Sequence, residues 1–396
     1  MGYPKTIGYL GEGPMSKPWP HRATRYPGDR ASVHSSFWFV AVVSVMTGAV
    51  VAPQTVGAQS EHALAQAPAF AVGIERCTFT DHTRRVINYS TAPHSVLSTN
   101  RTLVTEIRYP AQYVPGGPTE LAGAPPVAQS GGYPVIVFAH GYDVTPDTYA
   151  ALLDSWTRAG FVVVAPFFPD EQRSEVTAQR GVNTEGDLVN EPADLAFVTK
   201  SIVDAATSDP TACPIVSGLV RVSAIALAGH SDGATAVGML AYDRGVDPQG
   251  VSFASLRTGL SIRAIIVLSG DEDTAQPYGT EASEPNLLVI HSLTDQCNPI
   301  RNGVKIYDAV HQPNKWFLEL RTAHHLPPFD GADTSAFNVV VASSIRFLQI
   351  SLDGMSFPTR YLAFANEWPS IARMYVGGLG GAKFNPPRLA ENCGLN

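Results

Sequence analysis

The chain has 396 residues, of which 44% are hydrophobic and 16% charged, and its formal net charge at pH 7 is −8. This length and composition suit one large α/β domain, or a medium-sized domain with extensions. An acidic balance without a basic cluster gives no reason to expect a nucleic acid or an anionic membrane surface as partner.

The first 58 residues differ from the rest of the chain. Basic residues are scattered among Pro and Gly over residues 1–36, and an uncharged apolar run follows over 37–52. With small residues at Val56-Gly57-Ala58, this pattern predicts a secretory signal peptide over 37–58, cleaved after Ala58. Two alternatives stay open: translation starts later, for instance at Met15, or the segment stays uncut as a membrane anchor. We expect a secreted or cell-envelope protein that contacts a membrane only through an uncleaved leader.

Export would place the four cysteines in an oxidising compartment, where an even number predicts two disulfides. Three pairings are open, and the sequence does not choose among them. None of the four has the C-x-x-C spacing of a structural zinc site, so we expect no metal. The cysteines are Cys77, Cys213, Cys297 and Cys393.

A linker over residues 59–69 leads into the predicted catalytic domain, residues 70–351. The segments 70–80 and 102–109 read as strands, and the second alternates apolar and polar residues as a half-exposed edge strand should. Residues 114–132, rich in Pro, Gly and Ala, are expected to form a loop.

From Pro134 onward, short apolar runs alternate with segments of helical pattern. Strands without polar alternation are buried on both faces, so the pattern predicts a doubly wound, mainly parallel sheet flanked by helices. The expected strands are 135–139, 161–165, 222–228, 262–268, 287–290 and 316–320, and the expected helices are 146–159, 190–206, 232–243, 301–312 and 334–351. The polar segment 168–190 is expected at the ligand end of the sheet. Residues 352–396 are expected to form a C-terminal extension that packs on the domain.

The segment Gly229-His230-Ser231-Asp232-Gly233 follows one of the apolar runs and precedes an Ala-rich helix start. This G-x-S-x-G pattern in a strand–turn–helix context predicts a nucleophile elbow with Ser231 at its tip. Both outer positions require Gly because a Cβ there would collide with the neighbouring strand or helix. His230 is expected to be a packing residue of the turn.

A serine hydroxyl needs a basic histidine, and the histidine needs a carboxylate that holds its tautomer. In the fold with this elbow, the chain order is serine, acid, histidine, so the partners lie downstream of Ser231. Asp295 follows a buried strand and is the predicted acid, with Asp271 and Asp273 as alternatives. The pair His324-His325 follows the last strand, and we prefer His325 over His324 as the base.

Ester hydrolysis also needs donors for the oxyanion. One is the backbone N–H of Asp232, the residue after the nucleophile, and the second should follow an early central strand. The sequence His140-Gly141-Tyr142 follows such a strand, and we choose the N–H of Tyr142. The chemistry of these residues requires no cofactor.

With these residues placed, the chain resembles serine α/β-hydrolases over residues 70–350. Within them it is similar to a secreted bacterial branch that contains cutinase-like polyester hydrolases and platelet-activating factor acetylhydrolase-like esterases. The resemblance implies the α/β-hydrolase fold, and the branch's Ala two residues before the base matches Ala323 and favours His325. Cutinase-like enzymes usually carry Met where this chain has Asp232, which favours a general esterase over a polyester hydrolase.

These observations predict an exported, esterase- or lipase-like serine hydrolase that acts on a small-molecule or lipid ester through an acyl-serine intermediate. Two alternatives use the same residues differently. The chain could be a non-catalytic secreted binding protein on a hydrolase fold, or an acyltransferase or peptidase with the same triad. The sequence leaves the oligomeric state open.

Overall fold

A computed structural model of the chain describes residues 70–88, 93–113, 120–171, 185–271, 278, 284–355, 363–382 and 384. All of them belong to one compact unit, Ala63–Asn396. The predicted leader, residues 1–58, and the linker, residues 59–69, lie outside the described residues. Cleavage after Ala58 and export therefore stay predictions.

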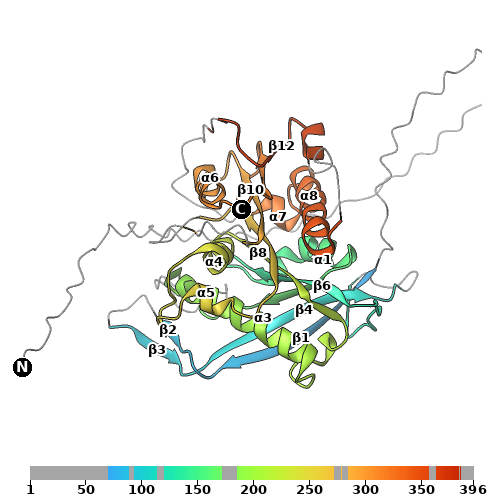
Figure 1. Ribbon diagram of the computed structural model, residues 1–396, viewed down its shortest axis with the longest axis vertical. Coiled ribbons are helices and arrows are strands. Elements are labelled where there is room, and N and C mark those ends of the chain that lie inside the picture. The colour runs from blue at the N-terminus through green and yellow to red at the C-terminus, as the bar shows by residue number, and fades with distance from the viewer. Residues whose placement is uncertain are drawn as a thin grey trace, which may run out of the picture. The chain divides into compact units, whose positions relative to one another are not determined.

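One large sheet organises the described part of the chain (Figure 1). It has ten strands in the order β12-β11-β10-β9-β8-β6-β7-β4-β1-β5. Their bounds are β1 Ala71–Asp81, β4 Arg101–Ala111, β5 Glu120–Ala122, β6 Tyr133–Ala139, β7 Val162–Pro166, β8 Val220–His230, β9 Ile262–Leu268, β10 Asn286–Ser292, β11 Lys315–Leu320 and β12 Ala372–Val376. A separate two-stranded sheet consists of β2 Val86–Asn88 and β3 Ser95–Ser98.

Six adjacent strands, from β7 through β11, are parallel to one another. Every residue of β6 and β7 is buried, as the apolar runs without polar alternation predict. Antiparallel pairings flank this parallel centre: β7 with β4 and β4 with β1 on one side, and β11 with β12 on the other. The sheet is thus mainly parallel, and its carboxyl edge collects the loops after β6, β8, β10 and β11.

Helices cover both faces of the sheet. Apolar residues of α3, α4 and α6 belong to one core cluster, and those of α1 and α8 to a second cluster. In Figure 1, α4 and α6 accordingly lie on one side of β8 and β10, with α1 and α8 on the other. The longer helices are α1 Ala150–Arg158, α3 Glu191–Thr207, α4 Asp232–Tyr242, α6 Ile300–Ala309 and α8 Thr334–Asp353, and the short ones are η1 Pro146–Tyr149, η2 Glu185–Asn190, η3 Pro214–Val216, α5 Phe253–Leu256, α7 Pro327–Asp330 and η4 Ala363–Glu367.

Helix α8 is the one described helix that is long and apolar enough to cross a membrane. Its residues Val340 and Phe347 are fully buried against the sheet. The hydroxyl of Ser344 accepts a hydrogen bond from Trp156 Nε1 of α1 at 2.8 Å. These contacts identify α8 as a core helix of the domain.

Strand β4 is an interior strand, so the prediction of a half-exposed edge strand over 102–109 is wrong. It pairs with β1 along 11 residues on one side and with β7 on the other. Its charged residues are buried in ion pairs instead of facing water: Nε of Arg108 donates to Glu106 at 2.8 Å, and Arg108 also pairs with Asp154. Alternating polarity marks an exposed face only when the polar groups have no buried partners.

The C-terminal extension contributes a strand to the sheet. Residues 372–376 form β12, which pairs antiparallel with β11. The hydroxyl of Tyr375 donates to Glu319 of β11 at 2.7 Å. The extension therefore completes one edge of the sheet, while residues 385–396 lie outside the described residues.

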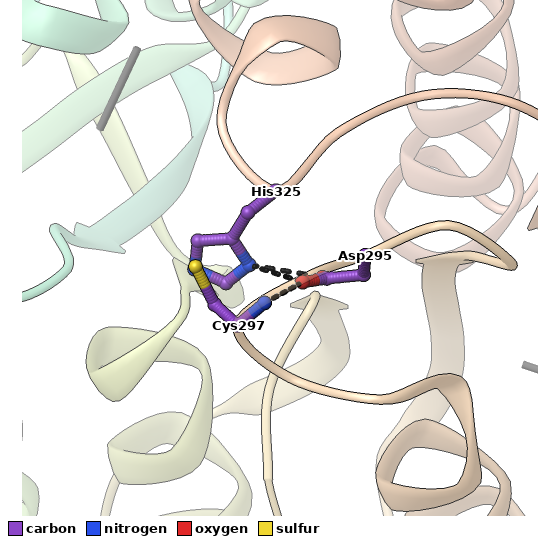
Figure 2. A group of neighbouring side chains, drawn as sticks. All are labelled: Asp295, Cys297 and His325. Atoms are coloured by element: carbon purple, nitrogen blue, oxygen red, sulfur yellow. Dashed lines mark hydrogen bonds and ion pairs between the residues drawn. The ribbon is translucent and has the colours of Figure 1, made fainter. Parts of the chain in front are cut away.

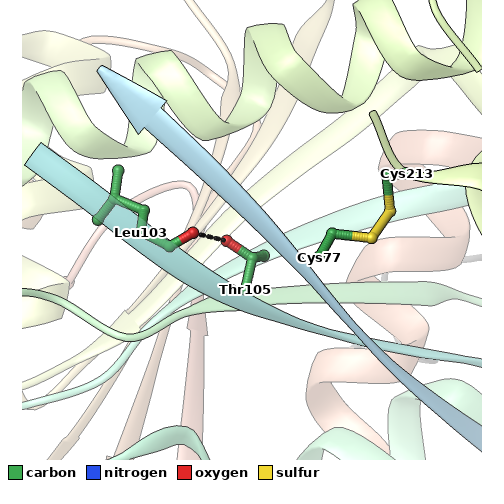
Figure 3. Close-up of a disulfide and its surroundings, with 4 residues drawn as sticks. All are labelled: Cys77, Leu103, Thr105 and Cys213. Atoms are coloured by element: carbon green, nitrogen blue, oxygen red, sulfur yellow. Dashed lines mark hydrogen bonds between the residues drawn. A yellow bond between two sulfur atoms is a disulfide. The ribbon is translucent and has the colours of Figure 1, made fainter. Parts of the chain in front are cut away.

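A disulfide joins Cys77 in β1 to Cys213, the residue before helix η3 (Figure 3). This resolves part of the pairing that the sequence leaves open. Cys297 is disulfide-bonded as well, and the remaining cysteine, Cys393, lies outside the described residues. Stable disulfides are typical of exported proteins, which agrees with the predicted signal peptide without testing it.

Removing this disulfide should destabilise the domain strongly, because the bond connects residues 136 positions apart in the chain. Closing so long a loop restricts the unfolded chain, so replacing both Cys77 and Cys213 by Ala is expected to lower the free energy of unfolding by about 3–5 kcal/mol. Urea unfolding of the double variant measures this. Treatment with a reductant is not equivalent, because it would also break the disulfide at Cys297. A decrease in the free energy of unfolding of less than about 1 kcal/mol would contradict the prediction.

Candidate active site

Ser231 forms the turn between β8 and α4, as the sequence predicts. It has φ 56° and ψ −120°, a conformation that residues with a side chain rarely adopt. Its N–H donates to the carbonyl of Leu268 in β9, and its carbonyl accepts from Ala234 and Thr235 in α4, each at 3.0 Å. Bonds to a neighbouring strand and to the following helix thus hold the strained backbone, as a nucleophile elbow requires.

Close backbone contacts require the two outer glycines of the turn. A Cβ on Gly229 would lie 2.3 Å from the carbonyl oxygen of Gly233. One on Gly233 would lie 2.4 Å from the carbonyl oxygens of Ala139 and His140. Both distances are far shorter than van der Waals contact, so the structure confirms the steric reason for these glycines.

His325 and Asp295 form a hydrogen-bonded pair in the loops after β11 and β10 (Figure 2). Nδ1 of His325 lies 3.0 Å from Oδ1 and 2.9 Å from Oδ2 of Asp295. A carboxylate only accepts hydrogen bonds, so His325 carries a proton on Nδ1 and donates it. In the neutral ring this tautomer leaves Nε2 unprotonated, which is the state that a general base needs.

The carboxylate of Asp295 is held by backbone donors as well. Its Oδ1 accepts the N–H groups of Cys297 and Asn298, both at 2.9 Å. Burial alone would raise the pKa of Asp295. The hydrogen bond and the charge of His325, the charge of His291 and the N–H of Asn298 together outweigh burial and lower this pKa to about 2. Asp295 is therefore an anion at physiological pH.

His291 in β10 supports the loop of the predicted acid, a role that no motif in the sequence indicates. Its Nε2 donates to the carbonyl of Asn298 at 2.8 Å and lies 3.6 Å from Oδ2 of Asp295. A Cβ on Gly303 of α6 would lie 2.5 Å from its Nδ1, so the helix packs directly on the ring. The sequence does contain one signal for this role, because His291 is a histidine inside a buried apolar strand, four residues before the predicted acid.

The alternative acids and the second histidine lie elsewhere. Asp271 is placed beside α4, where its N–H donates to Thr235 Oγ1 at 3.0 Å, and Asp273 lies outside the described residues. His324 is exposed, and its Nδ1 lies 3.3 Å from Gln296 Nε2. Among the candidate acids and bases that the structure describes, Asp295 and His325 are the two that are hydrogen-bonded to each other.

The turn that carries Ser231 contacts His325 through the neighbouring residue, His230. The ring of His230, the residue before Ser231, lies 4.5 Å from the ring of His325, centroid to centroid. Within the described residues, no hydrogen bond joins Oγ of Ser231 to His325. Catalytic hydrogen bonds of ligand-free sites are often long and tighten when substrate binds.

The loop after β6 orients the peptide group that precedes Tyr142. Nε2 of His140 accepts from the N–H of Phe168 at 3.1 Å, so the proton of the neutral ring is on Nδ1, which donates to the Gly141 carbonyl at 2.9 Å. Burial lowers the pKa of His140 to about 4, which keeps the ring neutral. In a trans peptide the N–H points opposite to the carbonyl, so the N–H of Tyr142 points away from the His140 ring.

The second predicted oxyanion donor begins helix α4. Asp232 is its first residue, and the N–H groups of the first turn of a helix point out of its N-terminal end. The positive end of the helix dipole lies at the same place and favours negative charge. The structure thus places both predicted donors in the two turns that pack against each other at Ser231, since a Cβ on Gly141 would lie 3.0 Å from Cβ of Ser231.

The polar segment 168–190 begins beside this loop. Its residue Glu171 accepts the N–H of Asp143 through the backbone carbonyl at 3.0 Å. Residues 172–184, which make up most of the predicted border of the cleft, lie outside the described residues.

Asp295, Cys297 and His325 lie close enough together to resemble a metal site, with ligand atoms within 4.8 Å of one another (Figure 2). The sulfur of Cys297 is in a disulfide, so it is not a thiolate ligand. Nδ1 of His325 is occupied by its bond to Asp295. These residues fit a hydrogen-bonded Asp–His pair and do not fit a metal ion.

A cavity of about 430 Å³ is lined by Tyr242, Arg257 and Glu284 together with neighbouring residues. It lies at the C-terminal end of α4, whereas Ser231 precedes the N-terminal end of that helix. The cavity is therefore separate from the candidate active site.

Comparison with known proteins agrees with this fold. A model of the chlorophyllase family matches residues 96–258, a segment that contains the Gly229–Gly233 turn and ends before Asp295 and His325. Among solved structures, a ferulic acid esterase from Streptomyces cinnamoneus has 17% sequence identity and a TM-score of 0.55. That match covers 76% of this chain and 97% of the esterase. A search of curated proteins found no matching sequence.

These matches confirm the predicted α/β-hydrolase fold, a mainly parallel sheet with helices on both faces. At 17% sequence identity, the similarity supports the fold alone and does not assign an activity. The assignment to a branch of cutinase-like and platelet-activating factor acetylhydrolase-like enzymes stays a prediction.

Proposed function

We propose that the chain is a serine hydrolase that cleaves carboxylic esters through an acyl-serine intermediate. In this proposal Ser231 is the nucleophile, His325 is the general base, and Asp295 orients His325. The observation that carries the proposal is the contact of Nδ1 of His325 with both carboxylate oxygens of Asp295, at 3.0 and 2.9 Å, in a chain that holds Ser231 at φ 56°. A serine on a strained turn and a buried Asp–His pair are the elements of a triad that activates a hydroxyl group.

The reaction has two halves. Oγ of Ser231 attacks the ester carbonyl carbon while Nε2 of His325 takes the hydroxyl proton, and the same proton then goes to the departing alcohol. Water next attacks the acyl-serine with His325 as base, which releases the acid and restores the serine. Asp295 stays ionised throughout and stabilises the imidazolium that forms in each half.

The negative oxygen of each tetrahedral intermediate would be bound by the N–H groups of Tyr142 and Asp232. The fixed carbonyl of Gly141 and the N-terminal position of Asp232 in α4 support these two donors. Because the donors belong to the backbone, they are already oriented before the charge develops, and each is worth about 10²–10³ in rate.

The substrate class in this proposal is a small-molecule or lipid carboxylic ester. A solved structure of similar fold is named a ferulic acid esterase, and the match of the chlorophyllase family includes the serine turn. Acyltransfer and peptide hydrolysis use the same triad, so the choice of ester over amide and of water over another acceptor needs measurement.

A fluorophosphonate probe tests the nucleophile directly. The serine oxygen displaces fluoride from phosphorus, so an activated serine becomes covalently labelled and an inactive one does not. We expect one labelled peptide, with the phosphonate on Ser231. Ser269 is a matched control, because it also follows a strand, has φ 51° and is fully buried; Ser269→Ala should label like the wild type.

The same preparation is then tested with p-nitrophenyl acetate and with the corresponding p-nitroanilide. Ester turnover with a burst of p-nitrophenol is the expected result. Absence of both labelling and turnover would favour a non-catalytic binding protein, and faster cleavage of the anilide would favour a peptidase.

A further inference from the structure

We propose that Tyr149 and His230 are positioning residues that connect the oxyanion loop to the backbone of the catalytic base through one chain of buried hydrogen bonds. This inference rests on the proposed function, because it concerns the geometry of the same site. It assigns a role to His230 that the G-x-S-x-G pattern does not, since the pattern leaves that position unspecified.

The chain of hydrogen bonds has three links. The N–H of Gly141 donates to the hydroxyl of Tyr149 at 3.2 Å. The hydroxyl lies 2.8 Å from Nδ1 of His230, and Nε2 of His230 lies 3.1 Å from the carbonyl oxygen of His325. The chain therefore begins one residue before the predicted oxyanion donor and ends at the predicted base.

The donor and the acceptor of each hydrogen bond follow from the two ends of the chain of bonds, the N–H of Gly141 and the carbonyl of His325. A carbonyl oxygen only accepts, so Nε2 of His230 carries the proton, and in a neutral ring Nδ1 must then accept from the hydroxyl of Tyr149. Burial, followed by the neighbouring ring of His325, lowers the pKa of His230 well below its ordinary value, which keeps the ring neutral. Burial also raises the pKa of Tyr149, which keeps its hydroxyl protonated. Every group therefore has one possible role, and all three bonds point the same way.

The side chains have little room to move. Tyr149 is fully buried and His230 is 2% exposed. The ring of His230 packs between Tyr149, His325 and Phe329, with centroid distances of 5.5, 4.5 and 5.0 Å. A buried network that is fully satisfied rigidifies the groups that it contains, and an unpaired member is costly.

The chain spans two parts of the site that the sheet holds apart. The oxyanion loop follows β6 and the base follows β11, with β8, β9 and β10 between these strands. Tyr149 and His230 therefore provide a route by which the distance between the oxyanion donor and the base is fixed.

Simple core packing is the competing interpretation. A buried tyrosine and histidine often serve only to fill space and satisfy each other. The two interpretations differ in their effect on the rate: packing alone changes how many molecules are folded, whereas positioning changes how fast each folded site reacts.

The test is Tyr149→Phe, which removes one oxygen and keeps the ring. Tyr109→Phe is the matched control, because Tyr109 is also fully buried and its hydroxyl also makes a hydrogen bond, to the Ala124 carbonyl at 2.8 Å, on β4. With p-nitrophenyl acetate, we expect Tyr149→Phe to lower kcat about 10- to 100-fold per active site with KM nearly unchanged, because small misplacements of catalytic groups cost rates of this size. Tyr109→Phe should keep the wild-type kcat. The burst amplitude counts active sites, so a loss of folded protein does not imitate the effect.

A second variant, His230→Gln, keeps a donor near the ε position and removes the acceptor for Tyr149. If the three bonds act as one chain, the variant that combines Tyr149→Phe with His230→Gln should have a kcat close to that of the slower single variant. Effects that multiply, or a Tyr149→Phe enzyme with the kcat of Tyr109→Phe, would overturn the inference. A wild-type protein that neither labels with fluorophosphonate nor hydrolyses the ester would instead overturn the proposed function.

Discussion

The Ser231→Ala variant is expected to lower kcat for p-nitrophenyl acetate by about 10⁶-fold. Without the hydroxyl no acyl-enzyme forms, so the burst of p-nitrophenol should vanish with the steady-state rate. The backbone donors and the Asp295–His325 pair would remain. A residual rate of about 10³-fold over water is therefore expected from an intact oxyanion site.

The variant should fold normally, because Ala keeps the backbone bonds of residue 231 to Leu268, Ala234 and Thr235. A cooperative thermal transition near that of the wild type is therefore the control. Ser269→Ala, with its comparable φ of 51°, should keep the wild-type rate. If Ser231→Ala kept more than about 1% of wild-type kcat, the nucleophile would have to be another residue.

Much of the parallel sheet could be predicted because its strands are buried on both faces. The predicted strand 262–268 coincides with β9, and the others differ from their observed bounds by one to two residues. Continuous apolar runs carry this information locally. The sequence favours an edge position for strand β4, because the partners of its buried charged residues, such as Arg108, lie far away in the chain.

Strand β12 had no usable signal. Residues 372–376 read Ala-Arg-Met-Tyr-Val, and such a short segment becomes a strand through its pairing with β11. The C-terminal extension was therefore expected to pack on the domain, and its contribution to the sheet could not be foreseen.

The candidate site likewise has residues that the sequence predicts and contacts that it does not. The serine turn has a local motif, and the acid and the base follow predicted strands in a fixed chain order, so their positions could be proposed from the sequence. The hydrogen bonds of Tyr149 and His230 join residues 81 positions apart. No local pattern encodes such a contact, because it depends on where two loops meet in space.

The Asp295→Asn variant is expected to lower kcat about 10⁴-fold while leaving the fold intact. The Asn side chain keeps Oδ1, which can still accept from the N–H groups of Cys297 and Asn298. Its amide group, however, is a donor facing Nδ1 of His325, so the ring would have to accept there and carry its proton on Nε2. That tautomer cannot take the proton of Ser231.

Asp271→Asn is the matched control, since Asp271 also follows a strand of the sheet and is the alternative acid. It should keep kcat near the wild-type value, and a larger loss in Asp271→Asn than in Asp295→Asn would reverse the assignment. Measuring kcat for both variants with p-nitrophenyl acetate decides between them.

The stability of the same variant provides a second, independent measurement. The pKa of Asp295 is lowered from 3.8 to about 2, so the folded state favours the ionised carboxylate. This contribution to stability is fully present above the unfolded pKa and is lost as the pH falls through the folded pKa. The difference in unfolding free energy between wild type and Asp295→Asn should therefore shrink as the pH is lowered from about 5 to about 2. A difference that stayed constant over this range would mean that the carboxylate does not hold the histidine as an ion pair.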